Sequence, residues 1–156
     1  MRRNWPRDAV EAAGTPDALK HTMVPRLLLA EDDAELRKLL ADDLRTDGWD
    51  VLEAADGQAL HAIARDLQAG LVAPIHLVIT DVRMPGPPAF EAVEQILARS
   101  RVPVLVMTGF LSEATFKEAR RLGALGVFHK PFDVDDLCTA ASCLRPDAAQ
   151  RPRPRR

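Results

Sequence analysis

Residues 78–86 read Val-Ile-Thr-Asp-Val-Arg-Met-Pro-Gly. An apolar run typical of a buried strand ends there in a single carboxylate, Asp81, and a turn with Pro85 and Gly86 follows at once. In a parallel α/β sheet, ligands bind just outside the carboxyl ends of the strands. Asp81 is therefore a candidate nucleophile or metal ligand. The alternative, from this stretch alone, is a helix cap or a solvated turn residue.

Length and composition are those of one soluble domain. The chain has 156 residues, of which 47% are apolar and 28% are charged, and this size allows one substantial core. No apolar run reaches the 18 residues or so that a membrane span requires, and the N-terminus lacks the apolar region of a signal peptide. We therefore expect a cytoplasmic protein without a membrane segment. Cys138 and Cys143 fall on different sides of one expected helix, so we expect no disulfide between them.

Charge is distributed unevenly along the chain. Residues 27–144 contain 19 acidic and 11 basic residues, whereas residues 145–156 contain five basic residues and one acidic residue. The acidic centre argues against nucleic-acid binding by the folded part, which would need a basic face. We interpret residues 1–25 and 146–156 as disordered ends, the second of them basic, around a folded domain at residues 26–145. The sequence leaves open whether translation starts at Met1 or at Met23.

Strand-like and helix-like patterns alternate without repeats. Strands are predicted at residues 27–30, 49–53, 75–80, 102–107 and 126–129, and helices at 33–47, 56–69, 89–99, 112–122 and 133–144. The first helix carries its apolar stripe at Leu36, Leu39, Leu40 and Leu44. Five strands alternating with five helices predict a doubly wound α/β fold, in which a five-stranded parallel sheet is covered on both faces.

Polar side chains follow the predicted strands at the points where they end. Glu31, Asp32 and Asp33 follow the first strand, Asp81 the third, Thr108 the fourth and Lys130 the fifth. In a doubly wound sheet of order 2-1-3-4-5, the first and third strands are neighbours, so Glu31, Asp32 and Asp81 converge. Three carboxylates need a counter-charge, which Mg²⁺ supplies with oxygen ligands. Each residue alone also has a structural interpretation, since acidic residues favour a helix start, but the set is what phosphoryl transfer requires.

Four motifs together resemble one known family. They are Ala30-Glu31-Asp32-Asp33, Asp81-Val-Arg-Met84-Pro85-Gly86, Thr108-Gly109 and Lys130-Pro131-Phe132, and their order resembles the receiver domain of two-component response regulators over residues 26–145. The resemblance implies a flavodoxin-like (βα)5 fold with strand order 2-1-3-4-5. It implies that Asp81 accepts the phosphoryl group and that Thr108 and Lys130 contact the phosphoryl oxygens. It also implies that Mg²⁺ is bound by Glu31, Asp32, Asp81 and the backbone carbonyl of Arg83, and that the Lys130–Pro131 bond is cis.

The resemblance also implies a function and partners. A stand-alone receiver would take a phosphoryl group from a sensor histidine kinase or a histidine phosphotransfer protein and signal to an unidentified downstream protein. A homodimer is a candidate output. Such a chain is not an enzyme beyond its own phosphotransfer and autodephosphorylation.

One departure from the family pattern leaves an alternative open. Val127 stands where the family usually has an aromatic residue, three positions before the lysine, and Phe128 falls on the opposite face of its strand. This departure favours a second hypothesis, in which the chain is a phosphorylation-independent adaptor on a receiver fold.

Overall fold

The computed structural model describes residues 24–147, which form a five-stranded parallel sheet of order β2-β1-β3-β4-β5 flanked by helices. The strands are β1 (Arg26–Ala30), β2 (Asp50–Ala54), β3 (Leu77–Asp81), β4 (Val104–Thr108) and β5 (Gly126–His129). The helices are α2 (Ala34–Thr46), α3 (Gly57–Gln68), α4 (Ala89–Leu97), α5 (Glu113–Arg121) and α6 (Val134–Cys143). The predicted doubly wound α/β fold and its strand order are confirmed.

The expectations for the two ends of the chain fall largely outside the described part. The leader at residues 1–25 and the tail at 146–156 lie almost wholly outside the described residues, and Met23 lies outside them as well. Within residues 24–147, no helix combines the length and the apolar character needed to cross a membrane. Cys138 and Cys143 are both free thiols, in line with the prediction.

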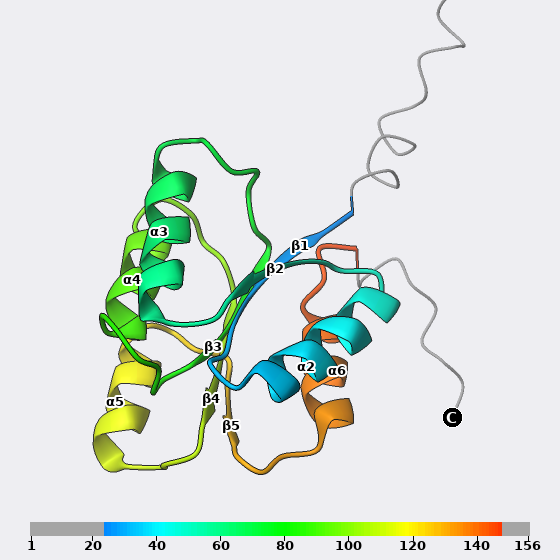
Figure 1. The fold of residues 1–156 in the computed structure, drawn as a ribbon, viewed down its shortest axis with the longest axis vertical. Helices are drawn as coiled ribbons and strands as arrows, with labels where there is room; N and C mark the ends of the chain where they lie inside the picture. Colours follow the sequence, from blue (N-terminus) through cyan, green and yellow to red (C-terminus); the bar gives the residue numbers. More distant parts are fainter. Residues whose placement is uncertain (1–23, 148–156) are drawn as a thin grey trace, which may run out of the picture.

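Two layers of helices cover the sheet, with α3, α4 and α5 on one face and α2 and α6 on the other (Figure 1). Side chains alternate between these faces along each strand. In β1, Leu28 packs toward α3–α5 and its neighbours Leu27 and Leu29 pack toward α2 and α6. The central strands are buried on both faces, which explains why their sequences read as unbroken apolar runs.

Side-chain caps fix where most of the helices begin. Asp33 accepts hydrogen bonds from the backbone N–H groups of the first turn of α2, and Asp56 and Ser112 cap α3 and α5 in the same way. Asp133 accepts from the backbone of Asp135 at the start of α6. Since α2 and α6 start directly beyond β1 and β5, these caps also hold the loops at the carboxyl edge of the sheet.

The structure corrects the sequence reading in two places. Leu39 lies outside the buried stripe of α2 and is 49% exposed, because the stripe passes through Leu40 and Leu44. The third and fourth strands begin later than predicted, at Leu77 and Val104. Ile75 and Val102 are still buried although each lies two residues before its strand, so apolar character begins earlier than the strand itself. Before the fourth strand, Pro103 also has no N–H to donate to a sheet ladder.

The loop after β3 rests against the first two turns of α3. The N–H of Gly57 donates to the carbonyl oxygen of Pro85 at 2.8 Å, and the ring of His61 lies 2.9 Å from the carbonyl oxygen of Pro88. A Cβ atom at Gly57 would lie 2.1 Å from the carbonyl oxygen of Pro87, closer than real atoms approach. The absence of a side chain at Gly57 therefore sets the position of the loop that follows Asp81.

We predict that Gly57→Ala destabilises the fold by about 1–3 kcal/mol, because the added methyl group displaces the loop after β3. The intrinsic preference of helices for alanine works in the opposite direction, by up to about 1 kcal/mol, so any net loss reports the collision. Urea unfolding measures the difference.

Gly109→Ala is the matched control, since a Cβ atom there meets nothing within 4 Å. Its free energy of unfolding should stay within about 0.5 kcal/mol of the parent. Equal stability of the Gly57 and Gly109 variants would contradict the proposed close contact.

Candidate phosphoryl and metal site

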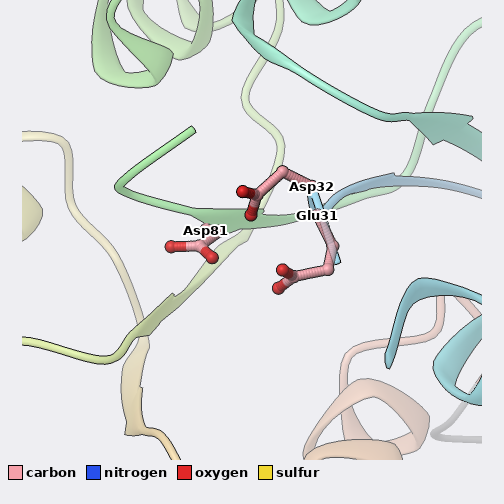
Figure 2. Close-up of side chains that lie close together, drawn as sticks. All are labelled: Glu31, Asp32 and Asp81. Carbon is pink, nitrogen blue, oxygen red and sulfur yellow. The ribbon is translucent and has the colours of Figure 1, made fainter. Parts of the chain in front are cut away.

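Three carboxylates meet at the carboxyl edge of the sheet. Asp81 is the last residue of β3, and Glu31 and Asp32 directly follow β1, its hydrogen-bonded neighbour. One oxygen from each of Glu31, Asp32 and Asp81 lies within 4.8 Å of the others, as Figure 2 shows. Glu31 is fully buried, Asp81 is 4% exposed, and Asp32 is open to solvent. The convergence predicted from the strand order is therefore present.

Lys130 lies between the two buried carboxylates. Its Nζ atom is 2.5 Å from Asp81 Oδ2 and 2.7 Å from Glu31 Oε2. The backbone N–H of Lys130 donates to the carbonyl oxygen of Thr108 at 2.8 Å, which aligns the ends of β4 and β5. The Lys130–Pro131 bond is cis, as the resemblance implied. Lys130 thus serves as the counter-ion of both acids.

Backbone groups satisfy the other carboxylate oxygens. Asp81 Oδ1 accepts a 3.0 Å hydrogen bond from the N–H of Arg83, and Glu31 Oε1 accepts one of 3.1 Å from Asp33. The guanidinium of Arg37 donates to the backbone carbonyl of Glu31 at 2.9 Å. Sequence reasoning missed this role of Arg37. The only local sign of it is that Arg37 lies in the first turns of α2, shortly after the acidic pair. Glu53, at the end of β2, instead pairs with Arg37 and Arg45.

The electrostatics of the cluster follow from burial. Burial raises the pKa of Glu31, with a further push from the nearby charge of Asp81, and the hydrogen bonds from Lys130 and Asp33 offset this only in part. Burial works to lower the pKa of Lys130, but its bonds to Asp81 and Glu31 outweigh that effect and the pKa is raised. Three carboxylates around one ammonium leave an excess of negative charge, and carboxylate oxygens are hard ligands. The residues present therefore fit a Mg²⁺ ion.

Thr108 occupies the expected place at the end of β4, but its hydroxyl is engaged within its own loop. Thr108 Oγ1 donates to the carbonyl oxygen of Phe110 at 2.9 Å and accepts from the N–H of Phe110 at 3.1 Å. Val127 packs toward α3–α5 and Phe128 toward α2 and α6, so the two lie on opposite faces, as predicted. The structure thus gathers Glu31, Asp32, Asp81 and Lys130, and leaves the Thr108 hydroxyl bound elsewhere.

Comparison with known proteins places this chain in a family. The model of the response regulator receiver domain matches residues 27–142. The chain belongs to this family. The resemblance to the receiver domain of two-component response regulators, noted in the sequence, is therefore confirmed.

Two relatives illustrate the range of proteins that carry this receiver. The chain is 36% identical over 119 residues to the transcriptional regulatory protein PdtaR of Mycobacterium tuberculosis, a match that covers 74% of this chain and 54% of PdtaR. The chain thus spans about half the length of that relative. It is 28% identical over 126 residues to sporulation initiation phosphotransferase F of Bacillus subtilis, covering 80% of this chain and 96% of that protein.

Solved structures agree with the fold. The chemotaxis protein CheY4 of Vibrio cholerae is 28% identical, with a TM-score of 0.65 over 78% of this chain and 99% of that chain. The non-phosphorylated HemR receiver domain of Leptospira biflexa is 25% identical, also with a TM-score of 0.65, over 85% of this chain and 99% of that chain.

The charge balance in the cluster yields a pH-dependent prediction. Lys130→Met removes the counter-ion and should lower the free energy of unfolding at pH 8 by about 3 kcal/mol in the absence of divalent cations. It should also raise the pKa of Glu31 further. A raised pKa in the folded state means that the protonated form is favoured, so the deficit relative to the parent should be largest at high pH and shrink as pH falls through that pKa.

Urea unfolding between pH 5 and pH 8 measures this deficit. The double variant Glu31→Gln with Lys130→Met is the control, because it has no carboxyl at position 31 to titrate, and its deficit should change less with pH. A deficit that is constant with pH in both variants would show that Lys130 does not neutralise Glu31.

Proposed function

We propose that this chain is a stand-alone receiver that takes a phosphoryl group from a phosphohistidine donor onto Asp81 in a Mg²⁺-dependent reaction. The proposal is carried by one observation, the joint placement of Asp81 with Glu31, Asp32 and Lys130 in a member of the receiver family. A nucleophilic carboxylate, a site that fits a hard cation and a fixed ammonium are what phosphoryl transfer requires.

The reaction uses the residues as follows. An oxygen of Asp81 forms a bond to phosphorus while the bond from phosphorus to the donor imidazole nitrogen breaks, and that electron pair remains on the imidazole. The product is an acyl phosphate. Lys130 leaves the Asp81 carboxylate and contacts a phosphoryl oxygen, and the Thr108 hydroxyl donates to another. Mg²⁺, held by Glu31, Asp32, Asp81 and the carbonyl of Arg83, would neutralise charge on the phosphoryl group.

The proposed partners follow from this chemistry. The donor is a sensor histidine kinase or a histidine phosphotransfer protein, and the output is a change of shape read by a second protein or by a homodimer. Sporulation initiation phosphotransferase F is matched over 96% of its length, so a relative of this chain consists almost wholly of the matched region. We propose a cytoplasmic location, and chemistry limited to phosphorylation and dephosphorylation of the chain itself.

Val127 favours a second candidate function. The aromatic side chain that usually turns inward in this family is replaced there by an aliphatic one, which packs in the core beside α3–α5. The chain would then act as an adaptor that binds its partner regardless of phosphorylation.

Phosphorylation with a small donor tests whether Asp81 is the acceptor. Incubation with Mg²⁺ and a small phosphodonor such as acetyl phosphate should add one phosphoryl group to the parent chain, and Asp81→Ala should abolish this addition, as measured by mass spectrometry. Asp33→Asn is the matched control: it removes a carboxylate just outside the cluster while keeping a side-chain cap for α2, so labelling should persist. Labelling that survives Asp81→Ala would overturn the proposal.

A second experiment separates the receiver from the adaptor. Beryllofluoride with Mg²⁺ mimics the phosphoryl group on a carboxylate, and under the first function it should change the dimerisation of the chain or its affinity for a partner. Sedimentation velocity with and without the mimic measures dimerisation directly. A pull-down with and without the mimic measures binding to a partner. Binding of the mimic at Asp81 with no change in either would favour the adaptor.

A further inference from the structure

The Thr108 hydroxyl has a single proton, and Phe110 holds it. Thr108 Oγ1 donates a hydrogen bond to the carbonyl oxygen of Phe110, with 2.9 Å between the two oxygens. The N–H of Phe110 donates back to Thr108 Oγ1 at 3.1 Å. A hydroxyl has one proton to donate, so Thr108 cannot donate to a phosphoryl oxygen on Asp81 until it releases Phe110. The state of Thr108 is therefore tied to the position of Phe110.

The ring of Phe110 makes a contact of its own with the loop after β3. The guanidinium carbon of Arg83 lies 4.5 Å from the centre of this ring, a cation–π distance, and the ring is still half exposed. The backbone N–H of Arg83 in turn donates to Asp81 Oδ1. The contacts thus run from Asp81 through Arg83 and Phe110 to Thr108, and they join the loop after β3 to the loop after β4.

The strand that usually supplies the aromatic residue offers no such contact. Val127 is aliphatic, and Phe128 packs edge-to-face on Phe132 in the core beside α2 and α6, with ring centres 5.9 Å apart. Gly109, between Thr108 and Phe110, has open space where a side chain would be, so this short segment has room to rearrange.

We propose that the Arg83–Phe110 pair is a latch that holds the Thr108 hydroxyl in its resting orientation and opens when Thr108 turns to the phosphoryl group. The two side chains are positioning residues, since they act on the phosphoryl group only through Thr108. Phe110 then performs the reporting role that Val127 cannot. The inference rests on the proposed function, because it needs a phosphoryl group on Asp81.

The latch has a measurable consequence for affinity. A contact made only in the resting state opposes engagement of the phosphoryl group, so its removal should tighten binding of a phosphoryl mimic. The loss of a cation–π pair at an exposed site corresponds to roughly a two- to five-fold change in affinity. Phe110→Leu removes the ring but keeps an apolar side chain and both backbone bonds to Thr108.

The test is a double-mutant cycle on the binding of beryllofluoride in the presence of Mg²⁺, followed by calorimetry. Phe110→Leu should bind the mimic about two- to five-fold more tightly than the parent, and it should have no further effect in the Arg83→Gln background or in the Thr108→Ala background. Phe110→Trp, whose ring binds cations more strongly, should shift the affinity in the opposite direction.

The outcomes distinguish this inference from the function on which it rests. If the parent chain does not bind the mimic at all, the proposed function fails and the latch fails with it. If the parent binds the mimic but Phe110→Leu has the same effect in the parent and the Arg83→Gln backgrounds, or no effect in either, the latch alone is overturned.

Discussion

Two acidic side chains are buried at one edge of the sheet, and a single ammonium group lies between them and offsets their charge in part. An ionised carboxylate removed from water is costly unless a charge or hydrogen bonds compensate it, and breaking a buried pair costs several kcal/mol. Lys130, at 2.5 Å from Asp81 and 2.7 Å from Glu31, supplies that compensation. The same arrangement leaves the cluster with excess negative charge. The site therefore favours a divalent cation.

The fold provides this cluster through the winding of the sheet. β1 and β3 are neighbours although a helix, a strand and a second helix separate them in the chain, so Glu31 and Asp81 emerge side by side. The right-handed crossovers place the helices on both faces and leave the carboxyl edge open. Caps at Asp33 and Asp133 and the contact of Gly57 with Pro85 then fix the loops around it.

Periodicity in the sequence was sufficient to predict the five strands, the five helices and their alternation. It was less accurate at the strand starts before Leu77 and Val104, because apolar character reports burial, and Ile75 and Val102 are buried although both precede the strands. It also assigned Leu39 to the core. A stripe of leucines at mixed three- and four-residue spacing is wider than the face a short helix can bury, and only the packing of α2 on the sheet selects Leu40 and Leu44.

The sequence by itself determined the residue types at the ends of the strands, and through them the family and the candidate acceptor Asp81. Tertiary structure decided which groups meet: Lys130 with Asp81, 49 positions away, and the guanidinium of Arg83 with the ring of Phe110. The physical reason is that periodicity specifies which face a residue occupies. The direction of its hydrogen bonds depends on neighbours that the chain brings from other strands. The aromatic missing at Val127 is visible in the sequence, whereas Phe110 as its counterpart emerges only when the two loops lie together.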